Sequence, residues 1–510
     1  MLTTNEPLRR EWTRFRRPGR LIAMAAAALA VVTFGLLYAF GNHASCDGPC
    51  PAEPTGPDGS LVNDQFYFLH RDLGENGSIT VRMTSMTGTI TYPPPDHDQI
   101  VPGLAPWAKA GIIIKDGIRQ GSSYAALMLT GSHGVRMQYD YRHDTAGSDG
   151  GVSAKSPRWL RLTRSGDTIT GYESADGERW AKVSTARLSG LPRTVQVGLF
   201  ATSPGDLTLR PVGLGGATEQ VRFTQASGAF DNVVLKGAPS AEGWIGDTVG
   251  EMNRTDWEKY HKASGAVEES GTITVTGTGD IGPGGAEGGG RSLERTLGGL
   301  TVGLLIVLVV AVRFVTSEYG REPARGAPVT RRVLAAKSVV VGAVTFVTGL
   351  LAVGIVIPVS VAILKGSGIP VIGVSALTGV RVVVGTAAVL ALAAVLALAL
   401  GALLRRAWLA TLVAVLTIAV PYMVTSFPLL ADGLSQWLLR VTPAAGFAAQ
   451  QTLIEYPQVV AHYAPSAGYF PLPWWAGIAV LCAYAVMLLG LALSRLPQSD
   501  ERAGQPVDWR

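Results

Sequence analysis

The residues of this 510-residue sequence that could do chemistry are few, and they form small groups. Cys46 and Cys50 stand in a CDGPC segment, where they could close a small disulfide on an oxidising side of a membrane or remain two free thiols. Asp140, Glu173 and Glu178 are the nearest candidates for a pair of catalytic carboxylates, but a solvated strand face or a turn explains each equally well. Neither the cysteines nor the histidines show metal-ligand spacing. The sequence therefore predicts no catalytic residue, no metal site and no cofactor.

Aromatic residues offer a different chemistry, because sugar rings stack on exposed aromatic faces while polar groups orient them. Trp107, Tyr139, Trp159 and Trp180 all lie in or beside segments of strand-like sequence. They are candidates for binding a carbohydrate ligand. The alternative is that these side chains belong to the apolar core beneath the strands that carry them.

The composition indicates a membrane protein. Apolar residues make up 47% of the chain and charged residues only 16%, below the ~25% typical of soluble domains. The net charge is +5, but the arginines gather at the ends of apolar runs. That distribution is typical of membrane topology rather than of nucleic-acid binding.

Six stretches reach the ~20 mostly apolar residues that a membrane-spanning helix needs. They cover residues 21–40, 297–316, 338–364, 382–404, 407–430 and 472–494. The first could instead be a cleavable signal peptide, because arginines precede it, although its apolar run is long for that purpose. The sequence thus predicts an α-helical polytopic membrane bundle of six helices.

The basic residues orient these helices, because loops rich in lysine and arginine remain in the cytoplasm. Sixteen basic residues lie before residue 21, in the 317–337 loop, at residues 405–406 and after residue 494. The short loops on the other side hold only Lys365, Arg381 and Arg440. We therefore expect a multi-pass plasma-membrane protein with both termini in the cytoplasm, including the tail 496–510.

Residues 1–20 precede the first apolar run and carry six arginines. Leu8, Trp12 and Phe15 fall on one face of a helix built from this segment. Such a pattern is typical of an interfacial helix that lies on the inner leaflet, and a plain basic anchor is the alternative.

The 256 residues between the first two apolar runs are long enough for a domain. Short strand-like runs separated by Ser-Gly-Asp and Asp-Gly turns predict an extracytoplasmic β-sandwich over residues 61–237. The run TITVTGTG predicts a β extension over residues 238–283. Pro- and Gly-rich linkers at residues 41–60 and 284–296 predict flexible tethers on both sides.

The segments PWAKAGIIIKDG, SSYAALMLTGSHGVRMQYDY, WLRLTRSGDTITGYESADGERW and GAFDNVVL carry a resemblance. In order and spacing they resemble the concanavalin A-like sandwich domain of the family labelled regulation of enolase, or DUF1349, over about Phe66 to Lys236. The resemblance implies a lectin- or glucanase-like fold that is often fused to bacterial surface proteins. It brings no established activity.

The segment FVTSEYGREPARGAPVTRRVLAAK resembles the loop between helices 2 and 3 of ABC-2 type transporter permeases, particularly those of high-GC Gram-positive bacteria. WLLRVTPAAGFAAQQ and GYFPLPWWAGIAVLCAY fit the same family, so the resemblance spans most of Leu297–Arg495 and the first helix. It implies a permease subunit that docks a separate ABC ATP-binding subunit and works as a homodimer or with a paired permease. The residues that match the docking motif are Glu318, Tyr319, Arg331 and Arg332.

The docking loop departs from the family pattern, because it is a few residues shorter and contains Pro323 and Pro328, which break a regular helix. The chain also has no G-x-x-x-x-G-K-[ST] motif, so ATP hydrolysis by that route falls to the partner. The interior of helices 3 to 6 lacks Asp, Glu and His. Ion-coupled carriers keep such groups at mid-depth, which disfavours a secondary transporter.

Taken together, these patterns favour the permease subunit of an ABC transporter with an outer glycan- or ligand-recognition domain and no enzyme activity of its own. The main alternative is a non-transporting, membrane-anchored glycan-binding or sensor protein. An enzyme acting on cell-wall sugars is a third possibility. The outer domain could also be a structural lid that binds nothing.

Overall fold

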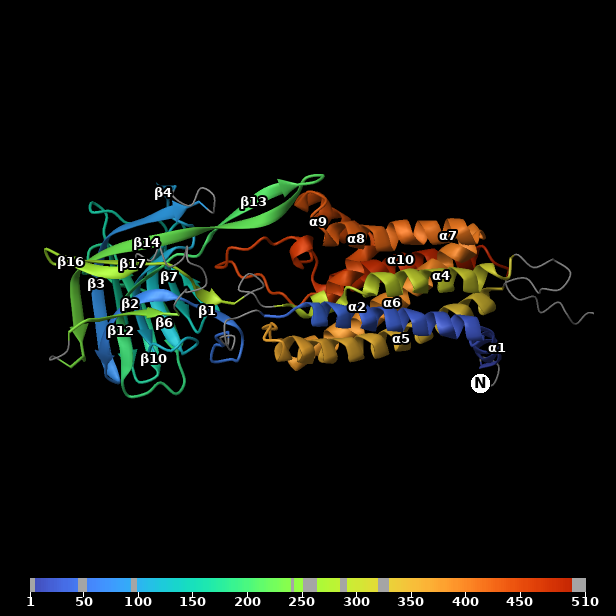
Figure 1. The fold of residues 1–510 in the computed structure, drawn as a ribbon, viewed down its shortest axis with the longest axis horizontal. Coiled ribbons are helices and arrows are strands. Elements are labelled where there is room, and N and C mark those ends of the chain that lie inside the picture. Colours follow the sequence, from blue (N-terminus) through green and yellow to red (C-terminus); the bar gives the residue numbers. More distant parts are fainter. Residues whose placement is uncertain are drawn as a thin grey trace, which may run out of the picture.

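The computed structural model describes residues 5–44, 53–92, 99–239, 243–250, 264–284, 291–319 and 330–497. A β-sandwich lies at one end of an elongated molecule and a bundle of helices at the other (Figure 1). The sandwich is built from the segment between the first long helix and the remaining long helices. This arrangement confirms the expectation of a β-sandwich inserted into a set of apolar helices.

One layer of the sandwich is a nine-stranded antiparallel sheet. Its main path runs β11-β10-β9-β3-β14-β17-β16, with β4 pairing β3 and β13 pairing β14. The strands are β3 (Asn76–Thr91), β4 (Ile100–Pro102), β9 (Arg158–Ser165), β10 (Thr168–Ser174), β11 (Ala181–Arg187), β13 (Asp206–Val212), β14 (Gly216–Lys236), β16 (Gly265–Glu269) and β17 (Thr272–Gly277).

The second layer is a seven-stranded sheet in the order β15-β2-β12-β5-β6-β7-β8. Its strands are β2 (Phe66–Leu73), β5 (Lys109–Lys115), β6 (Tyr124–Thr130), β7 (Val135–Tyr139), β8 (His143–Ala146), β12 (Val195–Thr202) and β15 (Ile245–Val249). A separate pair joins β1 (Val62–Asp64) to β18 (Ile281–Pro283). The segment expected as a β extension therefore contributes strands to both sheets and to this pair.

Both faces of the seven-stranded sheet are buried at its centre. On β5, Ile112 and Ile114 enter the core between the two sheets, whereas Ile113 enters a second apolar cluster on the opposite face. That second cluster includes Val62 and Ile281, which come from β1 and β18. Burial on both faces explains why this strand has a continuous apolar run rather than an alternating pattern.

The covered face also holds a buried charge network. The ammonium group of Lys115 donates to a carboxylate oxygen of Asp64 at 2.7 Å, and the hydroxyl of Tyr141 donates to the same oxygen at 2.7 Å. Burial, and then the charge of Asp64, raises the pKa of Tyr141 above its ordinary value. Burial lowers the pKa of Lys115, against the opposing effect of Asp64. This network ties β1 to the sheet.

The helical part contains five described helices that are long and apolar enough to cross a membrane. They are α2 (Pro18–Gly41), α5 (Arg331–Gly366), α6 (Ala376–Leu404), the helix Ala407–Ser426 and α10 (Trp474–Ser494). The helix Ala407–Ser426 is composed of α7 (Ala407–Ala414), a π-helical turn η3 (Val415–Ala419) and α8 (Val420–Ser426). Shorter elements are α1 (Asn5–Phe15), η2 (Leu293–Leu297), α9 (Asp432–Val441), η4 (Pro443–Gln450) and η5 (Pro465–Ala467).

The second expected span, 297–316, is a shorter helix. α4 (Leu300–Thr316) has 17 residues, so six full-length spans are not found among the described helices. The α-helix begins late because η2 and the pair Gly298 and Gly299 precede it. A Cβ at Gly299 would lie 2.6 Å from the carbonyl oxygen of Ala30, so glycine permits the start of α4 to pack closely on α2.

The sandwich contacts the bundle at several points. The hairpin of β13 and β14 extends beyond its sheet toward α9 (Figure 1), and Leu214 and Gly215 at its tip form bridges with Leu430. His462 lies 2.7 Å from Asp432 and 3.6 Å from Glu219 of β14. The two tethers that the sequence predicts to be flexible lie in part outside the described residues.

Candidate functional site

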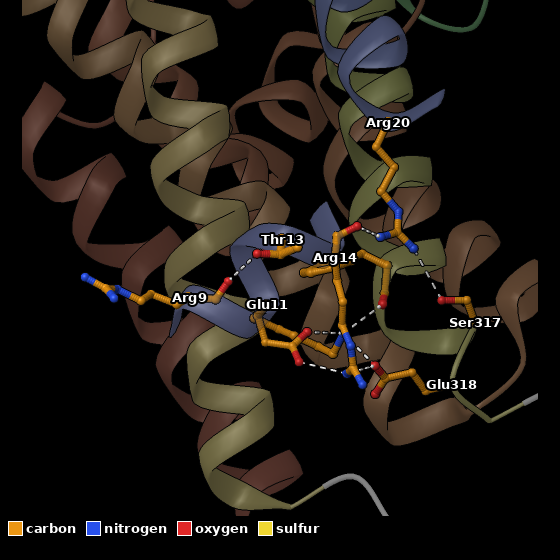
Figure 2. A network of polar contacts seen from close by, with 9 residues as sticks. Arg9, Glu11, Thr13, Arg14, Arg20, Ser317 and Glu318 are labelled. Atoms are coloured by element: carbon orange, nitrogen blue, oxygen red, sulfur yellow. Dashed lines mark hydrogen bonds and ion pairs between the residues drawn. The ribbon is translucent and has the colours of Figure 1, made fainter. Parts of the chain in front are cut away.

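Four charged side chains meet at the end of the bundle that is remote from the sandwich (Figure 1), and Figure 2 shows Glu11, Arg14 and Glu318 among them. Lys337, near the start of α5, lies 2.8 Å from Glu11 of α1 and 2.9 Å from Glu318 in the turn that follows α4. Arg14 of α1 lies 2.8 Å from each of the same two carboxylates. We call these four residues the charge cluster. It contains two cations and two anions, so it is neutral overall.

Aromatic rings enclose the charge cluster. The ammonium group of Lys337 lies 3.9 Å from the ring centroid of Phe314, and Phe15 of α1 packs edge-on against the same ring with centroids 5.1 Å apart. Lys337 and Glu11 are each only 1% exposed. Because charges so deeply buried are stable only when they are paired, each member of the cluster depends on the others.

The structure gives internal partners to most of the residues expected to dock an ATP-binding subunit. Glu318 belongs to the charge cluster, and Arg331 donates to the carbonyl oxygen of Leu496 at 3.0 Å. Tyr319 lies under the guanidinium of Arg405, and its pKa is raised by burial, an effect that Arg405 opposes. Arg332 is exposed. Residues 320–329 of the same loop, including both prolines, lie outside the described residues.

Sequence reasoning did not single out Glu11 or Arg14. Glu11 is an acid in an arginine-rich amphipathic segment. An acid among so many arginines is the feature of the sequence that could have indicated an ion pair at this position. The sequence also placed Leu8, Trp12 and Phe15 on one helical face, as expected of an interfacial helix on the inner leaflet. In the structure, Phe15 is buried and Leu8 packs against the core, whereas Trp12 is exposed, because Glu11 occupies the inward face beside them.

The aromatic ligand candidates are spread over both sheets. Trp107 is only 6% exposed and stacks on His133 with ring centroids 3.9 Å apart. Tyr139 stacks on His143 with centroids 4.3 Å apart. Both rings therefore have a face covered by a histidine, and Trp107 does not form an exposed platform.

Trp159 and Trp180 are brought together on the outer surface of the nine-stranded sheet. Trp180 donates its indole N–H to the carbonyl oxygen of Gly177 at 3.1 Å. A Cβ at Gly177 would lie 2.8 Å from the ring of Trp159, so this turn also contacts the second indole. The guanidinium of Arg161 lies 3.8 Å from the ring centroid of Trp180. Two half-buried indoles beside an arginine form the aromatic group best placed to meet a ligand.

The carboxylates considered for catalysis lie in different surroundings. Glu173 is buried and accepts hydrogen bonds from the backbone N–H and the hydroxyl of Ser148. Burial raises the pKa of Asp140, while Glu178 is exposed in a turn. In the part of the chain that the structure describes, no cluster of three or more His, Cys, Asp or Glu residues could hold a metal ion. The proposed pair Cys46 and Cys50 lies outside the described residues.

The comparisons with known proteins give matches among solved structures. No protein-family model and no curated protein matches it. Among solved structures, a functionally unknown protein from Saccharomyces cerevisiae is similar at 17% identity, over 37% of this chain and 83% of that chain, with a TM-score of 0.22. Scytalido-glutamic peptidase with a transition state analog inhibitor is similar at 9% identity, over 42% of this chain and 98% of that chain, with a TM-score of 0.28. A mutant GH43 protein from Bacillus licheniformis is similar at 14% identity, over 25% and 24% of the two chains, with a TM-score of 0.17.

These neighbours overturn one expectation from the sequence. The chain was expected to have no enzyme activity, yet the similar structures include two peptidases, one of them a member of the Eqolisin family, and a GH43 protein. The expectation that the chain lacks enzyme activity is therefore withdrawn. With identities under 25% and TM-scores of 0.28 or lower, the likeness also carries no argument for a particular reaction.

Proposed function

We propose that this chain is the membrane-spanning permease subunit of an ABC transporter, powered by a separate ATP-binding subunit. Its sandwich, which we interpret as concanavalin A-like, serves as an outer domain that recognises a glycan or another ligand. The permease acts as a homodimer or with a paired permease in the plasma membrane. Both termini and the charge cluster lie on the cytoplasmic side in this proposal.

The observation that carries the proposal is the charge cluster. To transmit the energy of ATP hydrolysis, the ATP-binding subunit must bind a segment of the permease that is held firmly against the membrane helices. Glu318 lies near the start of the docking loop and Lys337 at its end, and the two side chains are paired 2.9 Å apart. Both ends of the loop are thus held together and tied to α1, which supports a role in docking despite the shortened loop.

The exposure and the internal contacts of the docking-motif residues indicate different roles for them. Arg332 is exposed and is the proposed direct contact with the ATP-binding subunit. Glu318, Tyr319 and Arg331 have partners within the chain, so we assign them a positioning role. With the sandwich outside, the arginine-rich end of the bundle faces the cytoplasm, as the positive-inside rule requires.

The proposal predicts that a neighbouring gene encodes an ATP-binding protein with the Walker A motif, and co-purification of that protein with the full chain tests it. Replacing residues 320–329 by a Gly/Ser linker leaves the charge cluster in place and should abolish co-purification. Arg332→Glu should weaken it, whereas the matched control Arg440→Glu, an exposed arginine on the opposite side, should not. Unchanged co-purification with the replaced loop would contradict the proposal. A kinase or regulator recovered in place of an ATPase would favour the non-transporting sensor.

The recognition role of the sandwich has its own test. The full chain in detergent is applied to an array of bacterial surface glycans. Trp159→Ala and Trp180→Ala should each abolish binding, because both indoles flank the same turn. Trp244→Ala is the matched control. Trp244 also lies in the outer domain beside an arginine, but that arginine, Arg71, belongs to β2 of the seven-stranded sheet. A folded chain that binds no glycan would leave the sandwich as a structural lid.

A further inference from the structure

A cavity of about 1050 Å³ opens beside the charge cluster, between the start of α2, the second half of α4 and the start of α7. Its size is at the upper end of the ~300–1,000 Å³ that ligand sites occupy. Its lining falls into two zones along α4. Leu305, Ile306 and Val309 form an apolar floor, and Arg313, Ser317 and Tyr319 follow toward the helix end.

The polar zone of the cavity is strongly cationic. Arg17, Arg20, Arg313 and Arg405 all line it. Among the described residues, Arg17, Arg313 and Arg405 have no carboxylate within ion-pair distance, because the nearby Glu318 is held by Arg14 and Lys337. The cavity therefore presents uncompensated positive charge at the level where the helices end.

We propose that this cavity binds one anionic phospholipid of the adjacent leaflet. The guanidinium groups of Arg313 and Arg405 receive the phosphate, because arginine binds phosphate oxygens in a bidentate manner. An acyl chain lies along the apolar floor. Basic pockets between membrane helices on the cytoplasmic side are known sites for anionic headgroups, which gives the chemistry a physical precedent.

The length of the floor fits this occupant. Arg313 lies eight positions after Leu305, which corresponds to about 12 Å along the helix at 1.5 Å per residue. One leaflet contributes about 15 Å of the ~30 Å hydrocarbon core. The floor can thus cover most of one acyl chain while the arginines remain at headgroup level. The partly buried residues of α4 at positions 305, 306 and 309 leave this face open to lipid.

A second copy of the chain fits the cavity less well. Two copies meeting at this face would bring arginines against arginines, because among the described lining residues there is no acid. Like charges at an interface are strongly unfavourable. An anionic lipid has the complementary charge and the elongated apolar shape, and it is present at high concentration in the leaflet.

Native mass spectrometry of the full chain in mild detergent tests this inference. The chain is titrated with dioleoyl phosphatidylglycerol and, in parallel, with dioleoyl phosphatidylcholine. We expect one phosphatidylglycerol to bind at least about tenfold more tightly than phosphatidylcholine. Equal affinity for the two lipids would overturn the inference, as would a dimer that buries this face and binds neither.

Substitutions distinguish lipid binding in the cavity from lipid binding by positive charge elsewhere on the surface. Arg313→Gln with Arg405→Gln should weaken phosphatidylglycerol binding about 30-fold, the loss that two interfacial arginines at about 1 kcal/mol each produce. Arg9→Gln with Arg10→Gln removes the same charge from exposed positions outside the cavity and should have little effect. An equal loss in this control pair would refute a defined site.

A third variant tests the apolar floor with every arginine in place. Val309→Trp fills the floor and should block phosphatidylglycerol binding, while the circular dichroism spectrum shows the helices intact. Unchanged affinity in Val309→Trp would overturn the placement of the acyl chain. None of these readouts depends on transport, so the inference can fail while the proposed permease function stands, and the reverse also holds.

Discussion

Removing the cation at the centre of the charge cluster should release α1 from the bundle. Lys337→Met leaves Glu11, which is 1% exposed, and Glu318 with only Arg14 to balance them. Breaking a buried ion pair by removing one partner costs about 3–5 kcal/mol. Arg14 is 38% exposed and still reaches both carboxylates, so we take the lower end of that range. A loss of about 3 kcal/mol corresponds to a more than 100-fold change in the equilibrium between α1 packed on the bundle and α1 released from it.

Amide hydrogen exchange of the full chain in nanodiscs measures this equilibrium directly. Peptides covering α1 should lose about 100-fold or more of their protection in Lys337→Met. Lys365→Met makes the same substitution at an exposed position near the other end of α5 and should leave α1 unchanged. Adding Glu11→Gln to Lys337→Met should restore part of the protection, because the uncompensated buried charge is then removed. Wild-type protection of α1 in the single variant would refute the reasoning.

Three further outcomes follow from the sandwich. Asp64→Asn removes the partner of the fully buried Lys115 and should lower the free energy of unfolding by about 3–5 kcal/mol in chemical denaturation. Because burial raises the pKa of Tyr141 above the ordinary 10.0, the unfolded chain loses that proton first, so stability is full below pH 10.0 and falls as pH rises above it. Tyr141→Phe should remove that share of the alkaline decline in thermal unfolding, and an identical decline would contradict the assignment. Gly177→Ala should destabilise by about 1–3 kcal/mol and change the near-ultraviolet dichroism of Trp159, because φ is +79° there and the new Cβ would lie 2.8 Å from the indole.

The sequence predicted the sandwich and the apolar helices because both depend on local patterns. Turns such as Asp176-Gly177 and runs such as residues 109–115 are readable without knowledge of distant residues. Helix ends were less predictable. α4 begins at Leu300 rather than at residue 297 because a 3-10 turn and two glycines precede it. The helix after residue 407 contains a π-helical turn just before Pro421, which apolar composition alone does not reveal.

The candidate site was less accessible to sequence reasoning, because its contacts are non-local. Arg14 and Glu318 are 304 positions apart, and no pattern in either segment predicts that the two side chains form a contact. The aromatic candidates show the same difficulty in a different form. Trp107 and Trp159 each stand at the start of a segment of strand-like sequence, yet one is buried against His133 and the other lies half-exposed beside a turn. Which indole meets solvent is decided by packing between strands, not by the strand that carries it.

The charge cluster also changes what the count of basic residues means. The positive-inside rule counts every lysine and arginine near a helix end, whether or not it is paired. Here Lys337 and Arg14 are neutralised by two carboxylates, and Arg331 is directed at a carbonyl oxygen. Among the residues that line the cavity, Arg17, Arg313 and Arg405 have no carboxylate partner in the described part of the chain, so their positive charge remains uncompensated. Orientation follows from the total number of basic residues, whereas binding of an anionic headgroup depends on the few that have no internal partner.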